Sequence, residues 1–255
     1  MRLTLLLAGS GFPKLRSAVT LLESEGRRVL VDSGLCEDGD KVVAALALRG
    51  LAPEQVDTIV TTHLHYDHCG NHLLFPNARY IVGEADYEHT RGFIAHYHAD
   101  QTPAKAATAA ILRRNNAAIK EFYVRAIVRE VTRNLTFYDA LLAGDHRFQP
   151  VTLAEPLWLT SEIEVIATPG HTPGHLSVVA HGVELEGGRA TVLMGGDAIS
   201  SRNGELGAPE PHLAWQPSVY GRTRESLLAR HRWMIPGHDA LIDTRAALAA
   251  TGGVQ

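Results

Sequence analysis

The stretch THLHYDHCGNH, residues 62–72, places four side chains that commonly bind metal ions within six positions: His63, His65, Asp67 and His68. The run VDTIVTTH that leads into it is typical of a buried strand, which delivers the histidines at its carboxyl end. Residues two apart on a strand face the same way, so His63 and His65 can hold one ion together. Asp67 and His68 follow where the chain turns, and they face a neighbouring position. The stretch therefore predicts two adjacent ions.

Two ions need further ligands, since catalytic zinc commonly has about three protein ligands plus water. The second half of the chain offers three more, each at a strand end beside glycine. His171 lies in ATPGHTPGH, Asp197 follows two glycines in LMGGDA, and His238 follows a glycine in MIPGHD. Loops at one rim of a sheet commonly carry functional residues. We interpret the seven side chains as one two-metal site.

The rest of the chain runs twice from strand signals to helix signals. Short runs rich in Val, Ile and Leu, closed by Gly, predict strands, and apolar spacing of three and four predicts helices. The predicted strands lie within residues 2–9, 18–26, 27–34, 56–63, 78–89 (a strand and a turn), 157–171, 175–188, 189–198 and 234–240. The predicted helices lie within 39–50, 222–233 and 244–250, and 200–219 is a predicted loop. No linker divides the chain, so we expect one domain over residues 1–255, a sandwich of two mixed sheets with helices outside.

The stretch from about 93 to 148 differs in character. Thr102-Pro103 makes a good helix start, and the Ala-rich run through Arg133 has high helix propensity. Aromatic residues and histidines border this run. One interpretation is a helical layer packed on the core, and the other is a helical cap inserted over a substrate site; both can hold. The same insertion could pair with a second copy of the chain, giving a homodimer.

Composition excludes some classes of protein. The 255 residues are 45% hydrophobic and carry a formal net charge of −4, so we expect neither nucleic acid nor a membrane as partner. No run approaches the ~20 apolar residues of a membrane span. The apolar start is short and predicts a strand rather than a signal peptide. Two cysteines, Cys36 and Cys69, are too few for a disulfide scaffold and suit a reducing cytoplasm.

These motifs resemble those of the metallo-β-lactamase superfamily. H-x-H-x-D-H is residues 63–68, T-P-G-H-T-x-G-H is residues 168–175, and the G-D and final G-H pairs end at Asp197 and His238. The resemblance implies an α/β fold, a four-layer αββα sandwich of two mixed sheets flanked by helices, with a two-zinc site. It assigns the ligands in three sets: His63, His65 and His171 to one zinc, Asp67, His68 and His238 to the other, and Asp197 to both. The same ligands also bind Mn, Fe or Co.

The bridging Asp197 narrows the subfamily. True β-lactamases usually have Cys or Ser there, whereas glyoxalase II, quorum-quenching lactonases and tRNase Z have Asp. HLHYDHCGN and the single-domain length resemble the N-acyl homoserine lactonases. That resemblance implies a metal-bridging hydroxide that opens a carboxylic ester, above all a lactone, of a small-molecule substrate. Known lactonases carry Tyr where this chain has Ser200. A phosphodiesterase or nuclease, a glyoxalase II-type thioester hydrolase and a β-lactam hydrolase remain alternatives.

The sequence also predicts roles for residues around the candidate ligands. Asp67 can bind metal and also orient the nucleophile or accept its proton, which makes it the predicted catalytic residue. Asp32 resembles the superfamily's buried Asp that orients the ligands by hydrogen bonding. His175 is assigned a supporting place rather than a ligand's, and Cys69 is expected in the core. The predicted substrate contacts are Tyr66, Ser200, His212 and Trp215.

Overall fold

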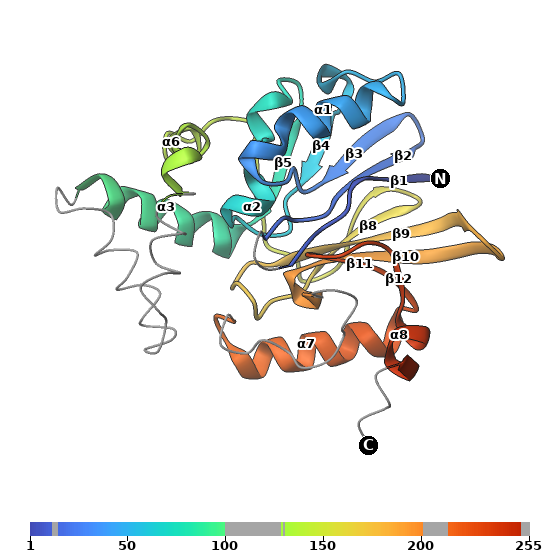
Figure 1. Cartoon of the computed structure of the whole chain (residues 1–255). Coiled ribbons are helices and arrows are strands. Elements are labelled where there is room, and N and C mark those ends of the chain that lie inside the picture. Colours follow the sequence, from blue (N-terminus) through green and yellow to red (C-terminus); the bar gives the residue numbers. More distant parts are fainter. Residues whose placement is uncertain (12–14, 100–128, 130, 201–213, 251–255) are drawn as a thin grey trace.

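The computed structural model describes residues 1–11, 15–99, 129, 131–200 and 214–250. Two six-stranded sheets lie face to face, and helices cover the outer side of each (Figure 1). Helices α1, α2, α3 and α6 lie on the side of the first sheet, and α7 and α8 lie on the side of the second. The predicted four-layer α/β sandwich is confirmed.

The first sheet comes from the first part of the chain and has its strands in sequence order. Strands β1 to β3 are antiparallel, and β3 to β6 are parallel. The strands are β1 (Arg2–Leu7), β2 (Val19–Ser24), β3 (Arg27–Val31), β4 (Thr58–Val60), β5 (Arg79–Gly83) and β6 (Phe148–Val151).

The second sheet has the order β12-β11-β10-β9-β8-β7. Its neighbours are antiparallel except for the parallel pair β10 and β11. The strands are β7 (Leu157–Thr160), β8 (Ile163–Ala167), β9 (Leu176–Leu185), β10 (Gly188–Gly196), β11 (Trp233–Pro236) and β12 (Ile242–Asp243).

Helices connect the parallel strands and close the outer faces. The α-helices are α1 (Gly39–Ala47), α2 (Tyr66–Cys69), α3 (Glu84–Ala99), α6 (Leu135–Leu142), α7 (Pro217–Arg230) and α8 (Thr244–Ala250). Short 3-10 turns lie at η1 (Cys36–Asp38), η2 (Pro53–Gln55), η3 (His72–Leu74) and η4 (Asp197–Ile199). None of the helices in the described ranges has both the length and the apolar character needed to cross a membrane.

Alternating side chains explain why the first sheet is buried on both faces. In β3, Val29 and Val31 point to the cluster between the sheets, while Leu30 points to the cluster under the helices. Ile163 and Val165 of β8 meet the first pair from the second sheet. Parallel strands covered on both faces read as continuous apolar runs, as these do. The core therefore has two layers, one between the sheets and one under the helices of the first sheet. The residues that follow the strands are not needed for this packing and can carry functional side chains.

Two predicted element boundaries were wrong. The sequence predicted a turn after β5, but α3 begins at Glu84 directly after that strand. Its first turn holds Glu84 and Asp86, which suit the positive end of a helix dipole and favour a helix start over a turn. The loop predicted for 200–219 ends earlier, because α7 begins at Pro217, a residue favoured in the first helical turn.

The described ends of the stretch 93–148 pack on the core. Phe137, Tyr138 and Phe148 are buried, and Phe93 and Tyr97 are partly buried against the same cluster. The packed-layer interpretation is confirmed for these ends. The predicted helix start at Thr102-Pro103 and most of the Ala-rich run lie outside the described residues, so the cap stays a prediction.

Candidate metal centre

All seven predicted ligands come together at one edge of the sandwich, where strands of both sheets end. His63 and His65 follow β4, and Asp67 and His68 lie in α2, which begins at Tyr66. The second sheet supplies its ligands directly after three strands, namely His171 after β8, Asp197 after β10 and His238 after β11. Ligands far apart in the sequence therefore lie side by side because the strand ends that carry them do.

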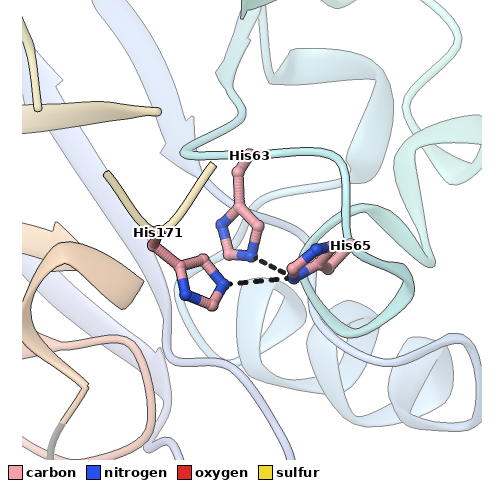
Figure 2. A group of neighbouring side chains, drawn as sticks. All are labelled: His63, His65 and His171. Carbon is pink, nitrogen blue, oxygen red and sulfur yellow. Dashed lines mark hydrogen bonds between the residues drawn. The ribbon is translucent and has the colours of Figure 1, made fainter. Parts of the chain in front are cut away.

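Three histidines form the first ligand group (Figure 2). His63 Nε2 lies 2.9 Å from His65 Nδ1, and His171 Nε2 lies 3.2 Å from the same atom. His63 and His171 are buried, whereas His65 is exposed. Burial lowers the pKa of both His63 and His171 well below the usual value, so these rings are neutral near pH 7. Neutral imidazoles present lone pairs, which is the state that a metal ion needs.

The second group is Asp67, His68 and His238, and all three are buried. Asp67 Oδ2 lies 3.9 Å from His68 Nε2 and 3.7 Å from His238 Nε2. His68 Nδ1 is 2.8 Å from a carboxylate oxygen of Asp32, and His238 Nδ1 donates to the backbone oxygen of Arg16 at 3.0 Å. Both rings therefore turn Nε2 toward the group.

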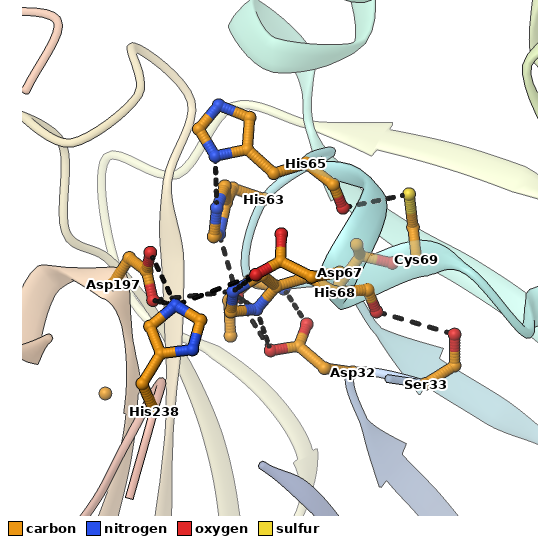
Figure 3. A network of polar contacts seen from close by, with 12 residues as sticks. Asp32, Ser33, His63, His65, Asp67, His68, Cys69, Asp197 and His238 are labelled. Atoms are coloured by element: carbon orange, nitrogen blue, oxygen red, sulfur yellow. Dashed lines mark hydrogen bonds and ion pairs between the residues drawn. The ribbon is translucent and has the colours of Figure 1, made fainter. Parts of the chain in front are cut away.

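Asp197 contacts residues of both groups, and Figure 3 shows its contacts with His68 and His238. Its Oδ2 is 3.4 Å from His171 Nε2, and its Oδ1 is 3.4 Å from His68 Nε2 and 3.2 Å from His238 Nε2. A β-carbon at residue 237 would stand 2.0 Å from Oδ1, which explains why glycine precedes His238. Oδ2 also lies 3.3 Å from His238 Nε2, so the carboxylate contacts ring nitrogens of both groups.

The charges at this centre call for cations. Burial alone would raise the pKa of Asp197, but His238, His68 and His171 hold it well below the usual value. Burial opposes a charge on His68, yet Asp32, Asp197 and Asp67 raise its pKa well above the usual value. Within the described part of the chain, His68 Nε2 and Asp197 Oδ1 are buried and make no hydrogen bond. The two atoms are 3.4 Å apart, and a buried imidazole nitrogen and carboxylate oxygen without hydrogen bonds fit a metal site.

Asp32 holds the second group from behind. It is buried and accepts hydrogen bonds from Thr62 N at 2.7 Å and Thr62 Oγ1 at 2.9 Å, in addition to its contact with His68. Its φ of 57° is unusual for a residue other than glycine. A strained backbone persists where its surroundings fix it, commonly at functional sites. The structure therefore places Asp32 where the sequence assigned it.

His175 lies behind His63, with the two rings stacked at 5.2 Å. It belongs to none of the ligand groups found in the described residues. Its Nδ1 lies 2.8 Å from Thr168 Oγ1, Thr168 bonds Ser177, and Ser177 donates to the backbone oxygen of Gly195. Because the Ser177 proton is used on Gly195, Thr168 must donate to Ser177 and His175 to Thr168. The chain of hydroxyls thus fixes the proton of His175 on Nδ1.

The predicted substrate contacts are placed less completely. Tyr66 and Ser200 are half-buried beside the ligands Asp67 and Asp197 in sequence, and Trp215 is 40% exposed. The backbone nitrogen of Trp215 donates to the backbone oxygen of His171 at 2.9 Å. The backbone of Trp215 therefore lies next to the candidate ligand His171. His212 lies outside the described residues.

Some contributors to the site were missed from the sequence. Arg16 acts through its backbone oxygen, a contact that no side-chain pattern reports. Tyr138 donates to the backbone oxygen of Leu64 at 3.1 Å, behind the ligand loop, and Cys69 is buried beside it, as expected. Asp86 binds the loop that carries His171. The acidic first turn of α3 was the only sequence signal for Asp86.

Comparison with known proteins finds animal and bacterial relatives. Metallo-beta-lactamase domain-containing protein 1 of Rattus norvegicus is 29% identical over 227 residues, 88% of this chain and 66% of that protein. An N-acyl homoserine lactonase of a Bacillus species is 24% identical over 246 residues, 86% of this chain and 79% of the lactonase. The chain spans about half to two thirds of the length of the animal relatives that it matches.

Solved structures show the same fold. A Thermotoga maritima protein, solved as a candidate metallo-beta-lactamase, superposes with a TM-score of 0.59 at 21% identity, covering 95% of this chain and 98% of that one. The family model of the metallo-beta-lactamase superfamily matches residues 13–238, a span that contains all seven candidate ligand positions and every strand except β1 and β12. The chain therefore belongs to the metallo-beta-lactamase superfamily.

Proposed function

We propose that this chain is a two-zinc hydrolase that cleaves a carboxylic ester, with a lactone such as an N-acyl homoserine lactone as the favoured substrate. The observation that carries the proposal is the position of Asp197, whose carboxylate lies 3.4 Å from His171 Nε2 of one ligand group and 3.4 Å from His68 Nε2 of the other. The sequence similarity to an N-acyl homoserine lactonase supports the choice of substrate class.

The structure also brings His63, His68 and Asp197 together, and the proposed ligands divide into two sets around this contact. His63, His65 and His171 would hold one ion, and Asp67, His68 and His238 the other, with Asp197 shared. Imidazole nitrogens and carboxylate oxygens suit zinc, and Mn, Fe or Co would also fit such a set. When bound, two neighbouring divalent ions activate a water at neutral pH and polarise the bond to be cleaved.

The chain itself would supply positioning and proton transfer. Asp67 stands between the buried histidines His68 and His238. We assign it to orient the attacking water and to accept its proton on a carboxylate oxygen. The exposed His65 and Trp215 mark the side from which substrate enters. Tyr66 and Ser200 are the proposed contacts beside the ligands.

The stretch from about 93 to 148 is the proposed cap. Its described ends, α3 and α6, lie on the same outer side as α2, which carries Asp67 and His68 (Figure 1). The buried Tyr138 of α6 contacts the loop between His63 and His65 through Leu64. These contacts support a cap anchored next to the ligands.

Hydrolysis profiling tests the proposed function. The zinc-loaded protein is assayed on lactones, aryl esters, thioesters, β-lactams and a phosphodiester, with the metal-depleted protein and an Asp197→Ala variant as controls. We expect turnover of lactones and esters that is lost in both controls. Cleavage of phosphodiesters with every ester and lactone intact would reject the carbonyl substrate while leaving the metal site in place.

A further inference from the structure

A carboxylate from the first half of the chain binds the loop that carries His171 in the second half. Asp86 is the third residue of α3, which follows β5 of the first sheet, and its side chain is buried. Its Oδ2 accepts a hydrogen bond from Thr172 Oγ1, and its Oδ1 accepts one from Gly174 N, both at 2.6 Å. Thr172 directly follows His171. One side chain thus binds the ligand loop at two points beyond the ligand.

The two halves approach too closely at this contact for larger residues. A β-carbon at Gly83 would lie 1.8 Å from the backbone oxygen of Gly174. A β-carbon at Gly174 would lie 2.5 Å from the backbone nitrogen of Asp86. Real β-carbons do not come this near to backbone atoms, so glycine at both positions is a condition of the contact. The loop lies directly on the start of α3.

The loop around His171 is held from the other direction as well. Trp215 N donates to the oxygen of His171 at 2.9 Å, and Gln216 N donates to the oxygen of Gly170 at 3.0 Å. These two bonds come from the segment that leads into α7. His171 therefore stands between a clamp on residues 170–171 and the Asp86 clamp on residues 172–174.

We propose that Asp86 is a positioning residue that sets where His171 meets His63 and His65, and thereby the affinity for the ion of the three-histidine group. The inference rests on the proposed metal site. An imidazole is short, so the place of its Nε2 follows the backbone of its own turn. Release of residues 172–174 would let that turn move away from the other two histidines, while the second group would keep its ligands.

The contact needs hydrogen-bonding atoms rather than charge. Burial raises the pKa of Asp86 to about 6, so its environment disfavours the anion. Asparagine has the same shape, and its oxygen can accept from Gly174 N while its amide donates to the Thr172 hydroxyl. Alanine can do neither. The two substitutions therefore separate the clamp from the charge.

The test measures metal binding, with no use of activity. Wild type, Asp86→Ala, Asp86→Asn and Thr172→Val are titrated with Zn²⁺ against a chromophoric chelator, and the visible absorption of each Co²⁺-loaded protein is recorded. We expect Asp86→Ala to bind one of its two ions about 10–100-fold more weakly and to show a changed spectrum for that ion alone. Asp86→Asn should match wild type in both. The affinity of Thr172→Val should lie between those of Asp86→Ala and Asp86→Asn. In the double variant Asp86→Ala/Thr172→Val, the loss of affinity should be smaller than the sum of the two single losses, because both substitutions remove the same hydrogen bond.

Asp145→Ala is the matched control. Asp145 is half-buried and accepts bonds from Arg147 N and from the Arg147 guanidinium, at a turn that carries no candidate ligand. Its loss should change stability and leave both ions bound as in wild type. If Asp86→Ala does not fold, the zinc affinities and cobalt spectra of Thr172→Val and Asp86→Asn are compared instead.

The outcomes separate this inference from the proposed function. A wild-type protein that binds no metal would reject the proposed site itself. Two ions in wild type with unchanged affinity and spectra in Asp86→Ala and Thr172→Val would overturn the positioning role alone. Equal losses in Asp86→Ala and Asp86→Asn would overturn the hydrogen-bond argument, since the charge would then be the essential property.

Discussion

Replacement of Asp32 should destabilise the fold strongly even without metal. The carboxylate is buried and accepts hydrogen bonds from Thr62 N and Thr62 Oγ1 in addition to its contact with His68 Nδ1. Removal of one partner of a buried, hydrogen-bonded ion pair typically costs about 3–5 kcal/mol. That is a large part of the roughly 5–15 kcal/mol by which a protein domain is stable. We expect Asp32→Ala to lose about this much.

Asp32→Gly tests the strain at the same position. With φ at 57°, any residue with a β-carbon is strained by about 1–2 kcal/mol, and glycine is not. Glycine normally costs about 0.5–1 kcal/mol relative to alanine, because its unfolded chain is freer. At residue 32 the two effects oppose each other, so Asp32→Gly should be at least as stable as Asp32→Ala.

The assay is urea unfolding of the metal-free proteins, followed by circular dichroism. Asp139, which lies within helix α6 and is exposed, provides the control pair: there Asp139→Gly should be less stable than Asp139→Ala. A loss below about 1 kcal/mol in Asp32→Ala would refute the buried-network reasoning, since that is the size of one ordinary hydrogen bond. If Asp32→Gly were less stable than Asp32→Ala, as is usual for glycine, the argument for backbone strain at residue 32 would be refuted.

Further predictions concern the centre and its surroundings. Asp197→Ala should lower the metal content measured by atomic emission from about two ions per chain to one or fewer, because it removes the shared carboxylate. Asp67→Asn should nearly abolish lactone turnover in steady-state assays. A chelator should remove the ion held with the exposed His65 much faster than the buried one, giving two phases in a stopped-flow record. Asp86 has its pKa raised to about 6, so its contribution to stability is full below pH 4 and is lost as the pH rises through 6; relative to Asp86→Asn, wild type should lose up to about 3 kcal/mol over this range in urea unfolding.

The sequence predicted that the seven candidate ligands would lie together, because their positions follow from local rules. A strand end fixes the direction of His63 and His65, and a glycine beside Asp197 or His238 permits close approach. The same rules identified the sheets, since both alternation and continuous apolar runs are local patterns.

The residues that support the ligands depend on contacts between distant segments. His238 is held by the backbone of Arg16, 222 positions away, and the His171 loop is held by Asp86. The first contact has no side-chain signature at all. The second involves a carboxylate that reads locally as an ordinary helix start. Tertiary packing decides both, and one sequence does not display it.

The division of the candidate ligands between the two halves of the chain has a consequence for synthesis on the ribosome. His63, His65, Asp67 and His68 emerge first, but each ion group is completed only by a residue of the second half, His171 in one case and His238 in the other. A nascent chain that ends before His238 cannot assemble the complete centre. Binding of both ions at the proposed centre therefore requires that the two halves have docked, and the bound ions would report a completed fold.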